Sequence, residues 1–454
     1  MAIETRNPAT GELLERFAEW PPEQVDETIA ATHRAATAWR AVPLAERARL
    51  MRRAAEVLRA GKEEYAHTMT VEMGKPIREA RAEVEKCAWA CEYYADTAAD
   101  HLAPEEAHSD GSKAYVRFDP IGIVLAVMPW NFPFWQVFRF AAPALMAGNA
   151  GLLKHASNVP RCALAIEEVF RDAGFPVDLF RALIIGSGPV AALIDDPRVK
   201  AVTLTGSDFA GRRVGERTGA AIKKSVLELG GSDPFVVLED AELEQCCAVA
   251  ATARCINNGQ SCIAAKRFIV VRGRLAEFLE RFQTQMESLV MGDPLDEATN
   301  IGPMARVDLR DELHGQVTRS IAAGAHLVTG GQVPDGPGAF YPPTILADVA
   351  PGQPAYDEEL FGPVAAVIAA ADEADAVRIA NDTPFGLGAS LWTADTARGE
   401  RLAAQIDAGS VFINGMVKSD PRLPFGGVKA SGYGRELARF GIREFVNVKT
   451  VWVR

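Results

Sequence analysis

A cysteine in an exposed connection is the residue of this chain best placed to act as a nucleophile. Cys262 follows Asn258-Gly259-Gln260-Ser261 and lies between the predicted end of a helix and the start of a strand. Such connections present side chains at clefts, where a thiolate can attack an electrophile. The spacing alone also permits a structural thiol, so the residues that accompany this cysteine matter.

Two further side chains could serve thiol chemistry. Glu228 lies at the carboxyl end of a predicted strand and precedes two glycines, where it could accept a proton or activate a water. Asn131 follows a predicted buried strand, and its amide could donate to a developing oxyanion. Taken singly, a surface glutamate and a turn-forming asparagine remain open alternatives.

The other cysteines and the histidines indicate neither disulfides nor a metal. The seven cysteines are odd in number, irregularly spaced and without a Cys-x-x-Cys pair, which disfavours a disulfide framework. Cys87 and Cys91 would share one helix face as small buried hydrophobic side chains. No histidine stands in a His-Glu-x-x-His motif or a Cys/His cluster, so we predict no metal site.

Charge and hydropathy exclude several classes of protein. The net charge is −12 and no Lys/Arg cluster offsets it, so nucleic acid is not an expected partner. No apolar run reaches the ~18 residues of a membrane span. Residues 1–11 hold no apolar segment after a basic start, so no secretory signal is predicted and the cytoplasm is the expected compartment.

The first hundred residues predict helices. Residues 21–61 and 62–99 are rich in Ala, Glu and Arg, with breaks at Pro43, Gly61 and Gly74-Lys75-Pro76. A length of 454 residues suggests two or three domains, of which these helices would open the first.

Strands and helices then alternate. Residues 113–118 predict an exposed strand and 121–128 a strand buried on both faces. Further strands are predicted at 151–154, 181–185, 200–205 and 223–229, with helices at 160–173, 189–195 and 210–220. This rhythm predicts a parallel sheet that binds ligands at the carboxyl ends of its strands.

A second α/β run begins at Pro234. Its first helix is expected to be capped by Asp240 and to end at Asn257-Asn258-Gly259. Strands are predicted at 265–271 and 364–369, a Gly- and Pro-rich loop at 330–343, and an exposed strand at 445–453.

The candidate residues stand in motifs that occur together in one known family. MPWNFP, LELGGSDP and NNGQSC follow one another at 128–133, 227–234 and 257–262. They are accompanied by NPATGE at 7–12, EMGKP at 72–76, EELFGP at 358–363 and PFGGVKASGYGRE at 424–436. The chain therefore resembles the aldehyde dehydrogenase superfamily over nearly its whole length.

The resemblance implies an α/β fold with three parts. Residues 1–106 and 121–229 would form a Rossmann-type parallel-sheet domain that binds NAD(P), and residues 230–431 an α/β catalytic domain. Residues 107–120 and 432–454 would form a small β element for oligomerisation. By analogy, the chain would assemble as a homodimer or homotetramer.

The resemblance also implies catalytic roles. In this family a thiolate attacks the aldehyde, hydride passes to the nicotinamide, and water hydrolyses the thioester. Carried over, Cys262 is the nucleophile, the Asn131 amide and the Cys262 backbone N–H form the oxyanion hole, and Glu228 activates the water.

Cofactor-binding residues follow from the same resemblance. Glu359 would hold the nicotinamide ribose, with Phe361 nearby. Gly211 follows Thr205-Gly206-Ser207, which opens a helix whose N–H groups can meet the pyrophosphate. Gly186-Ser187-Gly188 is a weaker alternative, because Pro189 follows it and no third glycine completes the loop. The expected set is Trp130, Lys154, Ser157, Thr205, Gly206, Ser207, Gly211, Leu229, Glu359 and Phe361.

Two positions favour NADP over NAD, although both are expected to bind. Lys154 ends its predicted strand where the adenosine ribose should lie. Ser157 occupies a position at which many NAD-using members carry a glutamate that would repel a 2′-phosphate.

The substrate side resembles succinate-semialdehyde dehydrogenases of the short form. Arg139, Trp135 and Asn131 are spaced by four residues on one helical face, and members of this group bind the substrate carboxylate with residues matching Arg139 and Ser419. A structural ion pair remains an alternative for Arg139. Some members carry a second arginine where this chain has Ile256, and a second cysteine where it has Ala264.

Other functions remain possible from the sequence. Another semialdehyde or a short aliphatic aldehyde could be the substrate. A CoA-acylating dehydrogenase is disfavoured, since that branch typically lacks the glutamate. A catalytically silent structural homologue is disfavoured by the joint presence of Cys262, Glu228, Asn131 and Lys154.

Overall fold

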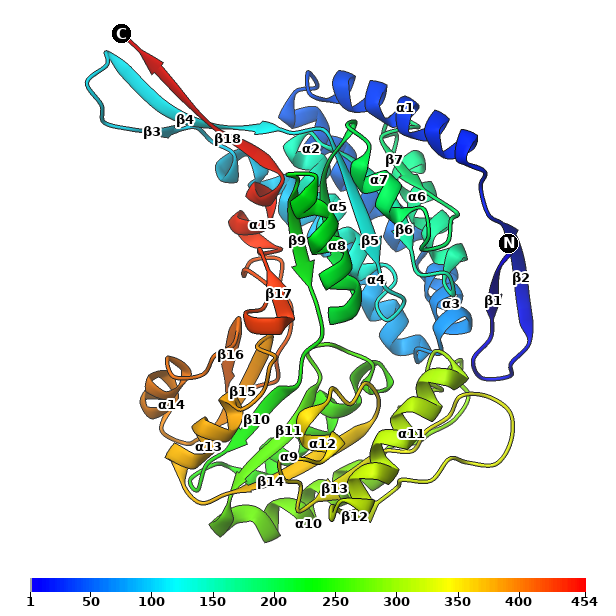
Figure 1. Ribbon diagram of the computed structural model, residues 1–454, viewed down its shortest axis with the longest axis vertical. Helices are drawn as coiled ribbons and strands as arrows, with labels where there is room; N and C mark the ends of the chain where they lie inside the picture. Colours follow the sequence, from blue (N-terminus) through cyan, green and yellow to red (C-terminus); the bar gives the residue numbers. More distant parts are fainter. Residues whose placement is uncertain (1) are drawn as a thin grey trace.

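Four helices near the amino terminus confirm the predicted helical region and its breaks. The computed structural model describes residues 2–454 (Figure 1). The helices are Pro22–Trp39 (α1), Leu44–Ala60 (α2), Lys62–Met73 (α3) and Ile77–His101 (α4). Cys87 and Cys91 are buried on one face of α4, as predicted.

These helices are preceded by a β-hairpin, which the sequence pattern does not reveal. Its strands, Ala2–Arg6 (β1) and Leu13–Ala18 (β2), pair antiparallel. Both are short and leave most of their side chains at least partly exposed, so they carry no clear alternation of apolar residues.

The first parallel sheet carries the predicted strand–helix alternation. Its order is β17-β9-β8-β5-β6-β7, with β17 antiparallel at one edge. The strands are Ile123–Met128 (β5), Ala150–His155 (β6), Phe180–Ala182 (β7), Val199–Thr205 (β8), Lys224–Glu228 (β9) and Gly432–Tyr433 (β17). The helices are Trp135–Ala147 (α5), Pro160–Asp172 (α6), Val190–Asp195 (α7) and Asp208–Ala220 (α8). β5, β7 and β9 are each two residues shorter than predicted, whereas β6 is two residues longer.

A second sheet forms the other lobe, with the order β12-β13-β14-β11-β10-β15-β16 and β12 antiparallel. Its strands are Asp233–Val237 (β10), Ala265–Val271 (β11), His326–Thr329 (β12), Thr344–Ala347 (β13), Val364–Ala370 (β14), Gly388–Trp392 (β15) and Ser410–Ile413 (β16). The helices and 3₁₀ turns are Leu243–Cys255 (α9), Ile256–Gly259 (η1), Arg272–Arg274 (η2), Leu275–Glu287 (α10), Val307–Ala322 (α11), Pro354–Asp357 (α12), Glu373–Asn381 (α13), Thr396–Ala403 (α14) and Lys429–Ser431 (η3).

The predicted cap of α9 is wrong by two residues. Glu242, not Asp240, accepts hydrogen bonds from the backbone N–H groups of Glu244 (3.0 Å) and Gln245 (2.9 Å). Asp240 instead accepts from the Thr393 hydroxyl (2.9 Å) and fixes the segment after β15. The longer glutamate side chain reaches the helix start, which leaves the aspartate free for a contact distant in sequence.

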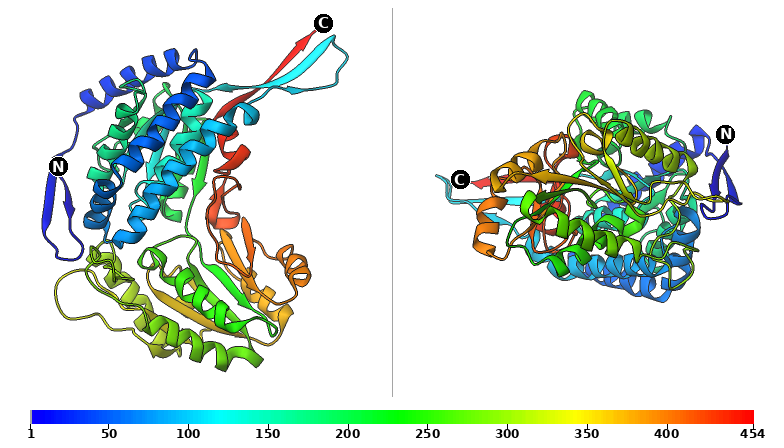
Figure 2. Two further views of the ribbon diagram at one scale, coloured as in Figure 1. Left: turned by 180° about the vertical axis from the view of Figure 1, so that it is seen from behind. Right: turned by 90° about the horizontal axis from the view of Figure 1, so that it is seen from below.

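A three-stranded sheet projects from the body as an arm (Figure 1 and Figure 2). It pairs Val446–Val453 (β18) with Lys113–Pro120 (β4), and Glu105–Glu106 (β3) with β4. The arm differs from the predicted element 107–120 and 432–454 in two ways. It begins earlier, at β3, and residues 432–445 pack on the first lobe, where β17 pairs with β9 and Ala438–Glu444 forms α15.

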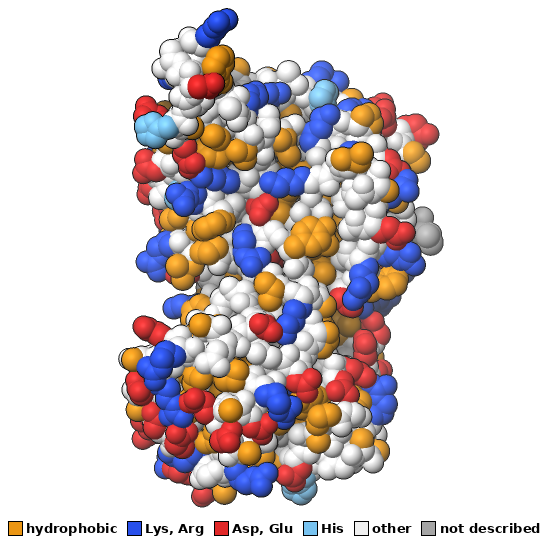
Figure 3. Space-filling view, turned by 60° about the vertical axis from the view of Figure 1, so that its left-hand side comes forward, with side chains coloured by type: hydrophobic (Ala, Val, Ile, Leu, Met, Phe, Trp, Pro, Cys, Tyr) orange, Lys and Arg blue, Asp and Glu red, His pale blue; other side chains and the backbone are white. Residues whose placement is uncertain are grey.

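On the surface seen in Figure 3, acidic and basic side chains are interspersed. This face carries no large patch of a single charge. Within residues 2–454, no helix is both long enough and apolar enough to cross a membrane. The two lobes meet where β5, β8 and β9 end and where the loop before β11 begins. That junction holds the predicted chemical residues.

Candidate active site

The loop before Cys262 is fixed by its two asparagines. Asn257 and Asn258 have φ angles of 55° and 56°, a left-handed conformation in which asparagine is tolerated. The Asn258 amide donates to the carbonyls of Gly74 and Pro303 (2.9 Å each). The Asn257 amide donates to the carbonyl of Asn131 (2.7 Å), so this loop and the Asn131 loop are held together.

Close backbone contacts complete the loop. Gly259 has a φ of 73°, and a Cβ there would strike the backbone of Gly362, so only glycine fits. The Lys266 ammonium donates to the carbonyls of Ser261 (3.0 Å) and Cys262 (2.9 Å). The backbone that carries Cys262 is therefore held by contacts on both sides of the residue.

Cys262 differs from the other six cysteines. They are buried, whereas Cys262 is half-buried and lines two separate cavities. Burial raises the pKa of the Cys262 thiol to about 12, and the positive charges of Arg139 and Lys266 oppose that rise. The thiol therefore needs a nearby proton acceptor to react at neutral pH.

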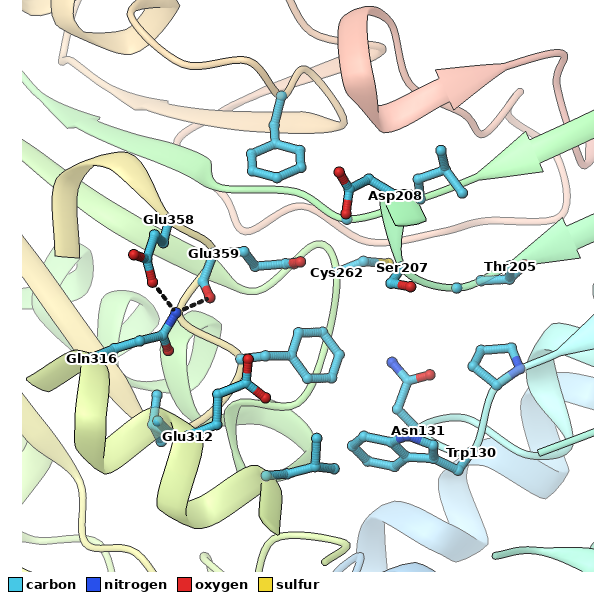
Figure 4. Close-up of a pocket in the computed structure, with 18 of the residues that line it drawn as sticks. Trp130, Asn131, Thr205, Ser207, Asp208, Cys262, Glu312, Gln316, Glu358 and Glu359 are labelled. Atoms are coloured by element: carbon cyan, nitrogen blue, oxygen red, sulfur yellow. Dashed lines mark hydrogen bonds between the residues drawn. The ribbon is translucent and has the colours of Figure 1, made fainter. Parts of the chain in front are cut away.

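Asn131 is oriented by its neighbours. Its side-chain oxygen accepts from Gln136 Nε2 (3.1 Å), and its nitrogen donates to the carbonyl of Gln260 (3.0 Å). Figure 4 shows this amide rising from the loop after β5 toward Cys262. Within residues 2–454 the backbone N–H of Cys262 donates to no acceptor. Both groups can serve an oxyanion formed on the carbon that Cys262 attacks.

Glu228 is a buried acid without a partner. Its side chain is only 2% exposed, and neither carboxyl oxygen has a hydrogen bond within residues 2–454. Burial raises the pKa of Glu228 to about 8; the carboxyl of Glu436 adds to this rise, while Arg139 opposes it. A carboxyl with a pKa near the working pH suits a general base. Glu228 lies behind the cavity surface, which its neighbours Leu229 and Gly230 form.

The first cavity is lined by many of the residues predicted to bind the cofactor. It measures about 480 Å³ and is lined by Trp130, Asn131, Thr205, Gly206, Ser207, Leu229, Cys262, Glu359 and Phe361, among others. The rings of Trp130 and Phe361 meet edge-on at 5.9 Å. The Glu359 carboxylate accepts from the backbone of Gly231 (3.0 Å) and lies 3.4 Å from the Lys266 ammonium. Gln316 donates to Glu358 and to the Glu359 carbonyl, as Figure 4 shows.

The amino-terminal end of α8 faces this cavity, and Ser207 is its N-cap residue. The Ser207 hydroxyl caps α8 by accepting from Ala210 (3.3 Å). A Cβ on Gly211 would lie 2.5 Å from the Leu229 side chain, so this glycine lets α8 approach β9 closely. Residues 186–188, the alternative glycine loop, do not line this cavity.

The two residues predicted to select the cofactor lie outside this cavity, at the end of β6. Lys154 is only 7% exposed, and burial alone lowers its pKa. Ser157 is exposed three residues further on. Within residues 2–454 no carboxylate forms a salt bridge with Lys154, so its buried ammonium could pair with an added phosphate.

The second cavity lies on the other side of Cys262 and measures about 180 Å³. The predicted substrate residues Trp135, Arg139 and Ser419 all line it. Trp135 Nε1 donates to the Ser419 hydroxyl (3.0 Å), so these two side chains form one polar group. Most of the remaining wall is apolar, with Phe132, Ile256, Ile263, Val417 and Phe425.

Arg139 lines this cavity and also forms an ion pair within the protein. Its Nε pairs with the buried carboxylate of Glu436, and its Nη2 donates to the Thr205 hydroxyl (3.2 Å). Its guanidinium lies over the Phe425 ring at 4.6 Å. Much of its positive charge is therefore already neutralised by protein.

Three further residues of the site were given no role in the sequence analysis, although Glu436 ends the motif PFGGVKASGYGRE at 424–436. Lys86 lines the second cavity, Glu436 pairs with Arg139, and the Glu83 carboxylate accepts from the backbone of Phe134 and Trp135 (2.9 Å each). For the other two, the spacing along a predicted helix was the available signal. Glu83 and Lys86 are three residues apart on α4 and therefore share a helix face that turns inward.

Comparisons with known proteins agree with this geometry. Residues 1–451 match the model of the aldehyde dehydrogenase family. A protein of Synechocystis sp. named probable succinate-semialdehyde dehydrogenase [NADP(+)] is 53% identical over 453 residues, covering 100% of both chains. A Mycobacterium tuberculosis protein named succinate-semialdehyde dehydrogenase [NADP(+)] 1 is 51% identical over 456 residues, again covering 100% of both.

Solved structures agree as well. The crystal structure of succinic semialdehyde dehydrogenase from Streptococcus pyogenes in complex with NADP+ has a TM-score of 0.98 to this chain at 37% identity, and each chain is covered to 100%. The expected α/β fold is thereby confirmed. The chain belongs to the aldehyde dehydrogenase family.

Proposed function

We propose that this chain oxidises succinate semialdehyde to succinate with NADP, through covalent intermediates on Cys262. The observation that carries the proposal is the position of Cys262 between the two cavities. One cavity has the aromatic rings, carboxylate and helix start that suit a dinucleotide. The other has a largely apolar wall that also carries cationic groups, polar groups and the carboxyl groups of Glu79 and Glu83. The names of the relatives from Synechocystis and Mycobacterium support the same substrate and cofactor.

The reaction begins with a bond between sulfur and carbon. The Cys262 thiol gives its proton to a water, the thiolate attacks the aldehyde carbon, and the carbonyl oxygen takes the negative charge. The Asn131 amide and the Cys262 backbone N–H donate to that oxygen. NADP, when bound, supplies the acceptor for the hydride that leaves the same carbon, after which a thioester remains on Cys262.

Hydrolysis of the thioester is assigned to Glu228. Its carboxylate takes a proton from a water, the resulting hydroxide attacks the thioester carbon, and the carbon–sulfur bond breaks. Succinate is released and the Cys262 thiolate is restored. Glu359, held by Gly231 and Lys266, would hold the nicotinamide ribose of the cofactor.

Steady-state kinetics over a panel of aldehydes with each cofactor tests this function. We expect kcat/KM with NADP to be highest for succinate semialdehyde and much lower for butanal, which has the same chain length without the charge. The apolar lining of the second cavity favours a short aliphatic aldehyde as the alternative substrate. A higher kcat/KM for butanal than for succinate semialdehyde would select that alternative.

Cofactor choice is tested at Ser157. Ser157→Glu introduces a carboxylate three residues after Lys154, where it would repel a 2′-phosphate. Because like charges brought together can cost several kcal/mol, we expect the ratio of kcat/KM for NADP to that for NAD to fall at least about tenfold. An unchanged ratio would remove Ser157 from the proposal.

The proposal also covers how subunits associate and in which cell compartment the protein acts. The chain would form a homodimer or homotetramer through the arm, whose strand β18 exposes Val448 and Trp452 on one face. Phe118 lies opposite Val448 in the sheet and extends the same face. Seven cysteines without a disulfide fit a reducing compartment such as the cytoplasm.

A further inference from the structure

Glu79 on α4 carries a carboxyl group that reaches the loop before Cys262. Its side chain is half-buried and lines the second cavity together with Cys262. One of its oxygens accepts from the backbone N–H of Asn257 (2.7 Å), and within residues 2–454 the carboxyl group accepts no other hydrogen bond. Glu79 therefore joins α4 to the loop that presents the nucleophile.

No ion pair accounts for a carboxyl group at this position. Within residues 2–454 no ammonium or guanidinium nitrogen lies within 4.0 Å of the Glu79 oxygens. The basic residues nearest in sequence have other partners: Lys75 pairs with Glu83, and Arg78 donates to the carbonyl of Thr299 (3.3 Å). Because a half-buried carboxyl group without a counter-ion costs free energy, its hydrogen bond to the loop is the interaction that compensates.

Asn257 connects this contact to both sides of the oxyanion site. Asn257 is fully buried, and its side-chain nitrogen donates to the carbonyls of Asn131 (2.7 Å) and Gln260 (3.0 Å). The Asn131 side-chain nitrogen donates to the same Gln260 carbonyl (3.0 Å). A shift of Asn257 would therefore change the separation between the Asn131 amide and the Cys262 backbone N–H.

The backbone of Asn257 needs such support. Its φ of 55° and ψ of 42° are left-handed, a conformation that persists in residues other than glycine only where the surroundings hold it. The next residue, Asn258, is held separately through its bonds to the carbonyls of Gly74 and Pro303. Loss of the Glu79 carboxyl group would therefore release Asn257 and leave the rest of the loop attached.

The acceptor matters here more than the charge. Burial raises the pKa of Glu79 to about 7; Lys75, the hydrogen bond from Asn257 and Arg78 oppose this rise, and Glu83 adds to it. Near pH 7 the group is present both as acid and as carboxylate, and each form has an oxygen that can accept the N–H of Asn257. A neutral amide at this position should therefore hold Asn257 as well.

We infer that Glu79 is a positioning residue for the oxyanion site: by holding the Asn257 N–H, it sets the separation between the Asn131 amide and the Cys262 backbone N–H. The inference rests on the proposed function, whose mechanism assigns both donors to the oxyanion. Glu79 acts through Asn257 and not on the reacting carbon.

The test compares Glu79→Ala and Glu79→Gln with wild type, on the aldehyde that wild type oxidises best. Because a misplacement of about 1 Å can cost about 100-fold in rate, we expect Glu79→Ala to lower kcat about 10- to 100-fold with KM for NADP unchanged. Rapid mixing should show hydride transfer in the first turnover slowed by a similar factor, since the oxyanion forms before hydride leaves. Glu79→Gln should recover most of both rates.

Glu85 on the same helix provides the matched control. Its carboxylate accepts from Arg59 (3.1 Å) and Lys62 (3.0 Å) on the outer side of α4. Glu85→Ala should therefore leave kcat unchanged. If thermal denaturation shows that Glu79→Ala is unfolded, Glu79→Met takes its place, because methionine has a similar length and no oxygen to accept the N–H.

The inference on Glu79 is overturned if the folded alanine or methionine variant keeps the wild-type kcat and first-turnover rate. It is also overturned if Glu79→Gln loses as much activity as Glu79→Ala, since the charge or the proton would then be needed. A change confined to KM for the aldehyde would likewise overturn it, because Glu79 would then contact the substrate.

The proposed function fails by a different result, namely that wild type shows no preference for succinate semialdehyde over butanal. That outcome leaves the comparison among the Glu79 variants intact, because it is made with whichever aldehyde wild type oxidises best.

Discussion

At the scale of single residues, the protonation of Glu228 sets the pH range of the reaction. Burial and the neighbouring Glu436 raise the pKa of Glu228 to about 8, so most of this carboxyl is protonated at pH 7. Only the carboxylate can take a proton from water. Where hydrolysis limits the rate, kcat should therefore rise about tenfold per pH unit well below pH 8 and level off above it. A kcat independent of pH between 6 and 8 would contradict this role.

The separate roles of Cys262 and Glu228 can be resolved in the first turnover. Glu228→Gln should permit hydride transfer and slow hydrolysis, which rapid mixing would detect as a burst of reduced cofactor near one equivalent per site followed by a slow phase. Cys262→Ala should give neither phase while NADP still binds, because the covalent bond cannot form. Substantial steady turnover by Cys262→Ala would refute the mechanism.

At the scale of elements, the close contact of α8 with β9 supports the cofactor cavity. Gly211→Ala would push a Cβ to within 2.5 Å of the Leu229 side chain, which lines that cavity. We expect KM for NADP to rise several-fold with little change in KM for the aldehyde.

Gly219 on the same helix provides the matched control. A Cβ there would meet no atom within 4 Å, so Gly219→Ala should leave kinetics unchanged and stabilise the fold by up to about 1 kcal/mol. Equal effects of both alanines on KM for NADP would show that helix propensity, not the contact with Leu229, is responsible.

At the scale of the whole molecule, the arm is the part that the single chain leaves unpacked (Figure 1). Val448 is 59% exposed on a strand that leaves the body, and a charge there should oppose association of subunits. Val448→Asp should shift light scattering coupled to size exclusion toward a smaller mass, whereas Asn447→Asp, on the opposite face of β18, should not. A mass unchanged by Val448→Asp would place the subunit interface elsewhere.

The sequence by itself determined the local features of this protein. The breaks at Pro43 and Gly61, the buried strand that ends at Met128 and the NNGQSC loop all depend on neighbours within a few residues, so composition and periodicity reveal them. The motifs also identified the family, since each keeps its chemical residue beside the turn that presents it. The cap at Asp240 was wrong because a contact with residue 393, distant in sequence, competed for its side chain.

Only the tertiary structure decided which charges meet. Arg139 on α5 forms an ion pair with Glu436, almost 300 residues later in the chain. Lys86 on α4 donates a hydrogen bond to Ser419, which follows the last strand of the second sheet in sequence. No pattern within one segment reports such a pairing, because it depends on how two lobes and their connections pack. The sequence could therefore predict that Arg139 contacts the substrate. It could not show that Glu436 already pairs with the Arg139 guanidinium, because that contact exists only in the folded chain.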